Sequence, residues 1–193
     1  MAANPFELFD QWFTEVKGTA EVDPISMVIS TVTADGKPTS RVVFLKRIVN
    51  NVYYFFTNYN SDKSKALTAH PYASLNFHWR LPQHRQVRIE GAVIKASAEI
   101  SDEYFSTRPR GSQIGAWASP QSQVIRHREE LEDKVAAIEK SFENRDVPRP
   151  EFWGGWGIVP ERMEFWQAGE FRLHQRRLFV KSGNRWTETL LAP

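Results

Sequence analysis

The stretch EFRLHQRRLF, residues 170–179, gathers two guanidinium groups and an imidazole on a short length of chain. If it forms a β-strand, its side chains alternate between two faces, so Arg172, His174 and Arg176 point the same way. Guanidinium groups bind phosphate and carboxylate, and an imidazole exchanges protons near neutral pH. Trp166 precedes this face closely enough to share one cleft with it. The pattern favours an anionic ligand, although a charged strand face is more often a solvated sheet edge.

Three further segments combine cations with hydroxyl or amide groups, the mixture that a phosphate-bearing ligand requires. They are SRVVFLK (40–46), FFTNYNSDKSK (55–65) and YFSTRPRGSQIGAW (104–117). In the second, a helix begins at Ser61, and helix N-terminal amides beside a lysine can hold a phosphate. In the third, a proline and two glycines favour a loop of defined shape. Each segment alone is also typical of an ordinary element that binds no ligand: a strand end, a capped surface helix or a polar loop.

Other chemistries find little support in the sequence. Paired arginines repel a metal cation and no His–carboxylate spacing suits one, so we expect no metal site. The absence of cysteine excludes disulfides, thiolate nucleophiles and thiolate metal ligands. The chain carries no G-x-S-x-G elbow, Walker loop or G-x-G-x-x-G motif. A nucleotide-like cofactor would therefore bind without a glycine-rich loop.

Composition limits the class of protein. The 193 residues, 41% apolar and 13% aromatic, fit one folded domain. A net charge of +2 gives no general argument for a nucleic-acid or membrane partner. The N-terminal residues lack the basic and apolar regions of a signal peptide, and no run approaches the roughly eighteen apolar residues of a membrane span. We expect a soluble, cytoplasmic protein.

Periodicity predicts the elements that position these groups. An N-terminal helix should begin at Asn4 and Pro5, and a hairpin should turn at Asp35-Gly36. Further helices are predicted at 61–71, 97–108 and 119–144, with strands at 25–34, 39–48, 52–58, 72–79, 85–97, 156–167, 172–181 and 185–191. Short connections between the strands favour an antiparallel barrel or sheet with helical decoration over a parallel β-α-β fold.

Taken in order, the segments SRVVFLK, FFTNYNSDKSK, RQVRIEG, YFSTRPRGSQIGAW, FWGGW and EFWQAGEFRLHQR, with the terminal LAP, resemble the pyridoxine/pyridoxamine 5′-phosphate oxidase family. The resemblance extends from about residue 5 to residue 193. It implies a mainly β fold with helices (α+β): an antiparallel Greek-key split β-barrel with peripheral helices. It also implies a single FMN-binding domain over 1–193, with a helical insertion at about 97–143 and closing strands at about 153–193.

The resemblance further implies an enzyme that works as a homodimer, with each FMN at the subunit interface. FMN would oxidise the 4′ carbon of pyridoxine or pyridoxamine 5′-phosphate to give pyridoxal 5′-phosphate, and O2 would reoxidise the flavin to yield hydrogen peroxide. The residues implied to bind FMN are Arg41, Val42, Val43, Phe44, Leu45, Lys46, Phe56, Thr57, Lys63, Gln86, Gln121, Ser122, Trp166 and Arg176. Those implied to bind substrate are Lys46, Tyr104, Arg108, Ser112, Arg172, Leu173 and His174. Arg172 and His174 would be the catalytic pair.

Four departures from the family pattern bear on these expectations. Asp62 replaces an arginine, Phe56 a tyrosine and Gln175 an acid. The N-terminus is also short, so we expect the usual basic extension that can close over the substrate to be absent. A carboxylate repels a phosphate, so Asp62 shifts FMN binding towards Arg41, Lys63 and helix amides. Two alternatives remain open: a related FMN oxidase with another substrate, as in the phenazine-pathway relatives, and a non-catalytic carrier of flavin or pyridoxal phosphate.

Overall fold

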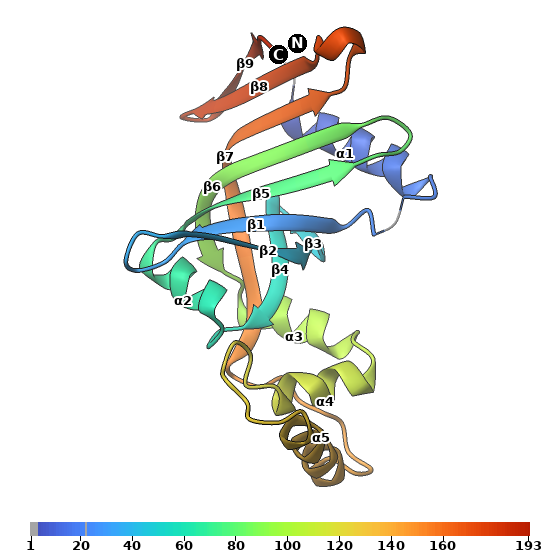
Figure 1. Cartoon of the computed structure of the whole chain (residues 1–193), viewed down its shortest axis with the longest axis vertical. Helices are drawn as coiled ribbons and strands as arrows, with labels where there is room; N and C mark the ends of the chain where they lie inside the picture. Colours follow the sequence, from blue (N-terminus) through green and yellow to red (C-terminus); the bar gives the residue numbers. More distant parts are fainter. Residues whose placement is uncertain (1–3, 22) are drawn as a thin grey trace.

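The computed structural model describes residues 4–21 and 23–193 and shows one curled antiparallel sheet with helices around it (Figure 1). The strands are β1 (Ser26–Val32), β2 (Pro38–Phe44), β3 (Arg47–Val49), β4 (Val52–Asn58), β5 (Tyr72–Trp79), β6 (Arg85–Lys95), β7 (Trp153–Gln167), β8 (Gln175–Ser182) and β9 (Arg185–Leu191). The helices are α1 (Pro5–Lys17), α2 (Asp62–Ala69), α3 (Ala98–Ser106), α4 (Arg110–Ala118) and α5 (Glu129–Ser141), with a 3-10 turn at Glu170–Arg172. The predicted fold class, mainly antiparallel β with peripheral helices, is confirmed.

The sheet has the order β2-β1-β5-β6-β7-β4-β3, and β8 and β9 continue from β7. Strand β7 is the longest, with 15 residues. Its first part pairs with β4 from Trp153 to Ile158, and its last part pairs with β8 from Arg162 to Gln167. Figure 1 shows β7 running from the α4–α5 end of the molecule to the β8–β9 hairpin. One strand thus connects the half-barrel to the C-terminal hairpin.

A bulge bends the β6–β7 pair. The register shifts between Glu90 and Gly91, and the two strands approach closely there. A Cβ placed on Gly91 would lie 1.9 Å from the carbonyl oxygen of Val159, so only glycine fits without moving the backbone. The bend sets the direction in which the second part of β7 leaves the half-barrel.

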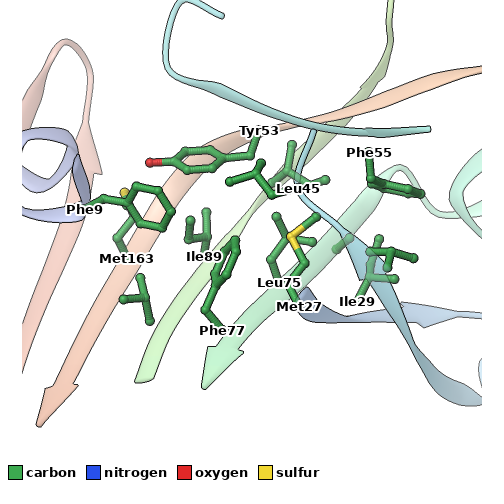
Figure 2. Packing of buried hydrophobic residues seen from close by; sticks show 14 of the residues in the cluster. Phe9, Met27, Ile29, Leu45, Tyr53, Phe55, Leu75, Phe77, Ile89 and Met163 are labelled. Atoms are coloured by element: carbon green, nitrogen blue, oxygen red, sulfur yellow. The ribbon is translucent and has the colours of Figure 1, made fainter. Parts of the chain in front are cut away.

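Helix α1 begins as the sequence predicts. The Asn4 side chain accepts a hydrogen bond from the backbone N–H of Phe6 at 3.0 Å, and Pro5 occupies the first turn. Its apolar face enters the core, which also holds residues from seven strands, from α2 and from the β2–β3 link (Figure 2). The labelled core residues of Figure 2 are Phe9, Met27, Ile29, Leu45, Tyr53, Phe55, Leu75, Phe77, Ile89 and Met163.

Replacing Phe9 with alanine should destabilise the fold. The Phe9 side chain is 0% exposed and lies edge-on to Tyr53 and Phe77, with ring centroids 4.9 and 5.4 Å away. Its truncation leaves a cavity that the surrounding aromatic rings fill only in part, at a cost of about 3–5 kcal/mol in the free energy of unfolding. Urea denaturation measures the loss. Val124→Ala is the control, because that apolar side chain is 98% exposed; an equal loss in both variants would contradict the packing argument.

The predicted helix over 119–144 was wrong in its first half. Residues 119–128 form turns and bends, Ser122 has a positive φ of 69°, and Val124 is 98% exposed. Helix α5 begins at Glu129, where three acidic side chains in the first turn favour its start. The Ser-Pro signal at residue 119 instead follows the end of α4.

Two strand predictions also need correction. The strand predicted at 39–48 is two strands, because the backbone N–H of Leu45 bonds Ile25 and that of Lys46 bonds Tyr54 in another part of the sheet. Leu45 turns into the core and Lys46 lies at the crossover. The strand predicted at 172–181 begins only at Gln175. Arg172 has a positive φ of 66°, so strand alternation does not place it and His174 on one face with Arg176.

Candidate active site

A cavity of about 440 Å³ opens among β2, β4, α3 and α4. All three phosphate-suited segments of the sequence contribute to it. We call this site the phosphate cavity; its lining is Val42, Val43, Phe44, Lys46, Phe56, Thr57, Asn58, Lys63, Tyr104, Arg108, Ser112, Gly115, Ala116, Ser119, Gln121 and Trp153. The segment 104–117, expected to be a shaped loop, is the end of α3 and most of α4 joined by a short turn.

One end of the phosphate cavity lies at the start of α2. The Lys63 ammonium group donates to Thr57 Oγ1 at 3.0 Å and to Ser61 Oγ at 3.2 Å. Thr57 in turn donates to Gln121 Oε1 at 2.8 Å. Burial, and then the nearby charge of Arg41, lower the pKa of Lys63. An anion beside a half-buried cation whose partners are all neutral would stabilise its charged form.

Ser61 lies at the N-cap position of α2, as predicted, but its hydroxyl does not cap the helix. It donates instead to the carbonyl oxygen of Asn58 at 2.7 Å. The first turn of α2 therefore has no side-chain cap from this residue, which leaves helix N–H groups for another acceptor. With Lys63, these amides form the donor set that a phosphate group requires.

Arg41 does not line the cavity, but its charge acts on Lys63 at this end. Its guanidinium donates to Thr31 Oγ1 at 2.7 Å and Thr39 Oγ1 at 2.8 Å. Burial lowers the pKa of Arg41, and the charge of Asp62 acts in the opposite direction. Asp62 itself lies near Lys65, 3.5 Å from its ammonium nitrogen. The cationic end therefore carries one carboxylate among its charges.

The other end of the phosphate cavity holds Arg108. Its guanidinium carbon lies 4.6 Å from the ring centroid of Trp153, and its Nη1 atom is buried without a hydrogen-bond partner among the described residues. Burial lowers the pKa of Arg108, while burial raises the pKa of Tyr104. A half-buried guanidinium with a free donor is suited to a strong acceptor such as phosphate. Tyr104 and Ser112 share this end of the cavity.

Stacked aromatic rings line part of the cavity. Phe56 stacks on Tyr104 with ring centroids 4.1 Å apart, and on Trp153 at 5.7 Å. A flat aromatic surface in the same cavity as two cationic groups fits a planar ligand that carries phosphate. Phe56 supplies this surface without a hydroxyl group.

The remaining predicted residues form a second group, the C-terminal cluster, defined by Gln86, Trp166, Arg172, Leu173, His174 and Arg176. Gln86 pairs with Trp166, and Trp166 pairs with Arg176, so these residues of β6, β7 and β8 lie side by side. The His174 ring lies 4.7 Å from the Trp166 ring. Trp166 therefore lies beside both His174 and Arg176.

A buried carboxylate fixes Arg176 within the C-terminal cluster. Glu164 is 3% exposed, and its Oε1 accepts from Arg176 at 2.8 Å while its Oε2 accepts from Arg88 at 2.6 Å. Arg176 also donates to the carbonyl oxygen of Ala192 near the chain end, at 3.0 Å. The guanidinium is thus held in place before any ligand arrives. Sequence reasoning named Arg176 but not Glu164, because the pairing across β7 and β8 is not visible in the sequence.

No residue of the C-terminal cluster lines the phosphate cavity. Trp153 belongs to the cavity and Trp166 to the cluster, and both lie on β7; at about 3.3 Å per residue, roughly 40 Å of strand separates them. Of the other predicted residues, Leu45 is buried in the core and Ser122 lies in the turn after α4. Within this one chain the predicted site residues therefore form two separate groups.

Several cavity residues were not named by the sequence analysis: Asn58, Gly115, Ala116, Ser119 and Trp153. Asn58 ends β4 just before the predicted helix, and Trp153 belongs to the quoted FWGGW segment, so both had a signal. Across residues 4–21 and 23–193 no group of three or more His, Cys, Asp or Glu side chains could hold a metal ion. In the same part of the chain, no helix is long and apolar enough to cross a membrane.

The curled half-barrel with a cation-lined cavity defines a split-barrel protein, and solved structures share this architecture. PhzG from Burkholderia lata 383, in complex with tetrahydrophenazine-1-carboxylic acid, superposes with a TM-score of 0.92 at 29% identity, covering 98% of this chain and 93% of that one. A pyridoxamine 5′-phosphate oxidase-related, FMN binding protein from Nostoc punctiforme shares the fold at a TM-score of 0.78 and 14% identity, with full coverage of both chains.

Sequence comparisons identify the family. The family described as pyridoxamine 5′-phosphate oxidase matches residues 14–142, and the pyridoxine 5′-phosphate oxidase C-terminal dimerisation region matches 153–193. Pyridoxine/pyridoxamine 5′-phosphate oxidases from Rubrobacter xylanophilus and Burkholderia multivorans are 47% and 48% identical, covering 98% and 100% of this chain and 87% and 90% of theirs. The chain belongs to the pyridoxine/pyridoxamine 5′-phosphate oxidase family, as the sequence motifs indicate.

Proposed function

We propose that this protein is a homodimeric, FMN-dependent oxidase of pyridoxamine and pyridoxine 5′-phosphates. It would form pyridoxal 5′-phosphate, with O2 as the electron acceptor and hydrogen peroxide as the second product. The observation that carries the proposal is the phosphate cavity itself: two phosphate-suited groups, at Lys63 and at Arg108, line one cavity together with stacked aromatic rings. Such a cavity suits two phosphorylated planar molecules that must touch each other, a flavin and a pyridine.

FMN fits the end of the cavity at α2. Its phosphate would be held by Lys63, Thr57, Gln121 and the free N–H groups of α2, with Arg41 adding a nearby positive charge. The exposed side chains of Val42 and Phe44 leave the edge of β2 open to a flat ring. When bound, the flavin supplies the redox chemistry by accepting a hydride from the 4′ carbon.

The substrate phosphate would bind at the other end. Arg108 provides a free guanidinium donor, and Tyr104 and Ser112 provide hydroxyl groups. Binding energy from this remote phosphate orients the reacting carbon without changing it chemically. The main work of the cavity residues is then to position the substrate.

The C-terminal cluster of one subunit would cover the phosphate cavity of the other. Two features support this arrangement: the two groups are separated along β7, and residues 153–193 match a dimerisation region. Phe171 and Leu173, beside Arg172, expose most of their apolar surface within a single chain. A partner subunit and a bound pyridine ring would cover them. Arg172 and His174 would then lie against the substrate ring.

One experiment tests the proposed function. The purified protein should show the absorption spectrum of bound flavin, and pyridoxamine 5′-phosphate added in air should yield pyridoxal 5′-phosphate and hydrogen peroxide in equal amounts. A protein without flavin would overturn the proposal. Flavin binding without turnover would favour a carrier of flavin or pyridoxal phosphate.

The similarity to PhzG favours one second candidate, an FMN oxidase that acts on another ring substrate. The two candidates differ in their need for phosphate: in the first, the buried donor of Arg108 binds the substrate phosphate, whereas the second needs no phosphate on its substrate. Turnover of pyridoxamine 5′-phosphate, with little turnover of pyridoxamine, supports the first. Faster oxidation of an unphosphorylated aromatic amine supports the second.

Asp62 should weaken FMN binding. Its carboxylate acts electrostatically on both Arg41 and Lys63, so it opposes a phosphate placed at the start of α2. Replacing it with asparagine should tighten FMN binding about threefold to tenfold, since an exposed charge contributes modestly. Quenching of flavin fluorescence measures the Kd.

Riboflavin, which lacks the phosphate, tests the cause. Its affinity should be the same in both proteins, and the gain in FMN affinity should shrink in high salt. Asp35→Asn, at the exposed tip of the β1–β2 hairpin, is the matched control and should alter neither affinity. Equal tightening of riboflavin would show that Asp62 acts through the structure of α2 and not through its charge.

A further inference from the structure

The turn that precedes β8 has an unusual backbone. Phe171 and Arg172 both have left-handed φ values, 53° and 66°, which residues other than glycine rarely adopt. Leu173 follows with φ −79° and ψ 71°, and the N–H of His174 bonds the carbonyl oxygen of Arg172 at 2.9 Å. These values describe an inverse γ-turn. Strained conformations of this kind are kept where they hold a side chain in a required position.

Gly169 closes this turn from the other side. Its backbone N–H donates to Nδ1 of His174 at 3.3 Å. A Cβ on Gly169 would lie 2.1 Å from the carbonyl oxygen of Leu173, so the approach that makes this bond requires glycine. The backbone on both sides of His174 is thus arranged around its ring.

This contact fixes which nitrogen carries the proton. In a neutral imidazole one nitrogen donates and the other accepts, and the partner of one nitrogen determines the state of the other. Because Nδ1 accepts from Gly169, the proton of the neutral ring lies on Nε2. The Trp166 ring, 4.7 Å away, restricts rotation of the imidazole. The free edge of His174 is therefore an N–H donor.

We propose that Gly169 is a positioning residue whose N–H keeps His174 in the Nε2–H form, so that His174 serves the substrate as a hydrogen-bond donor and not as a proton acceptor. The inference deepens the proposed function and rests on it. The acceptor of this hydrogen bond would be an oxygen or nitrogen substituent on the substrate ring, beside the reacting carbon. Arg172 lies on the same turn and would provide a positive charge beside the substrate, whereas His174 would provide a directional hydrogen bond.

The first test measures the ring and the glycine directly in the FMN-loaded dimer. With ¹⁵N-labelled histidine, the ring resonances of His174, assigned by their loss in His174→Ala, should show an unprotonated Nδ1 and a protonated Nε2. The Gly169 amide should exchange with water at least about tenfold more slowly than in His174→Ala, because a hydrogen bond protects it. A protonated Nδ1 in the neutral ring, or an unprotected Gly169 amide, would overturn the inference.

The second test asks which nitrogen the ligand uses. Glutamine at position 174 can place an amide N–H near the Nε2 position, whereas asparagine reaches only the Nδ1 position. Affinity of the FMN-loaded dimer for pyridoxal 5′-phosphate should fall by less than about fivefold in His174→Gln and by about thirtyfold in His174→Asn. Equal losses in the two variants would contradict a donor at Nε2.

A substitution of the glycine separates positioning from packing. Gly169→Ala should weaken pyridoxal 5′-phosphate binding about tenfold and remove the protection of the residue 169 amide, while FMN affinity and urea stability change little. Ala168→Gly, at the neighbouring exposed position, is the control and should retain wild-type affinity. The NMR measurements need no turnover. Normal turnover with a protonated Nδ1 would therefore reject this inference alone, and a protein without FMN or turnover would reject the proposed function.

Discussion

Replacing Arg108 with alanine is expected to lower kcat/KM for pyridoxamine 5′-phosphate by about a hundredfold to a thousandfold. The substitution removes a half-buried guanidinium whose Nη1 donor has no partner among the described residues, and hydrogen bonds to charged groups contribute about 1.5–3 kcal/mol each. FMN affinity should be unchanged, because the flavin phosphate is expected at the opposite end of the cavity. Steady-state kinetics and fluorescence titration measure the two effects.

Arg110→Ala provides the control for the loss of a cation from the same turn. Arg110 donates to the carbonyl oxygens of Arg145 and Phe142 and does not line the phosphate cavity. Its removal should leave kcat/KM within about twofold of wild type. Unphosphorylated pyridoxamine should be oxidised equally slowly by wild type and Arg108→Ala. An Arg108→Ala enzyme that still discriminates strongly for the phosphate would contradict the assignment.

A dimer made from two inactive subunits is expected to regain activity. Arg108→Ala damages the phosphate cavity and Arg172→Leu damages the C-terminal cluster, so each homodimer carries two defective sites. If each site combines the cavity of one subunit with the cluster of the other, the heterodimer has one intact site and one doubly defective site. Its kcat/KM per dimer should be about half that of wild type, whereas each parent falls about a hundredfold or more.

Co-expression with two different affinity tags isolates the heterodimer for this measurement. A heterodimer of wild type with Arg172→Leu should also show about half activity, which controls for the tags and the purification. If both groups instead served a cavity within one chain, every subunit of the doubly variant heterodimer would be defective. Activity at the level of the parents would then reject the shared site.

Local signals predicted the elements well where they were strong. The Asn4-Pro5 helix start, the Asp35-Gly36 hairpin and the strands at 52–58 and 72–79 agree with the structure. The errors arose where long-range contacts override local pattern. At Leu45 and Lys46 the chain changes strand partners, and at residues 170–174 the backbone turns although the residues alternate like a strand.

The site was predicted with similar limits. Motif resemblance selected residues that the fold gathers into two groups. The phosphate cavity contains most of those named from the segments 40–46, 55–65 and 104–117. Their separation along β7 was not visible, because neither strand length nor sheet branching follows from residue type. Glu164 was missed for the same reason: only the pairing of β7 with β8 shows that it holds Arg176. The two left-handed residues give no compositional signal, since neither is glycine.

The bend at Gly91 has a consequence for symmetry. In the proposed dimer each site is spanned by two copies of β7, one that carries the cavity and one that brings the cluster to it. Because both subunits have the same sequence, a substitution that changes the bend would displace both copies of β7 at each site. The two displacements are related by the dimer axis. A Cβ at this position would lie 1.9 Å from a backbone carbonyl oxygen. A change of side-chain rotamer cannot remove this clash, so a larger residue at position 91 must move the main chain. We therefore expect the bend at Gly91 to influence the distance between flavin and substrate, although Gly91 does not line the phosphate cavity.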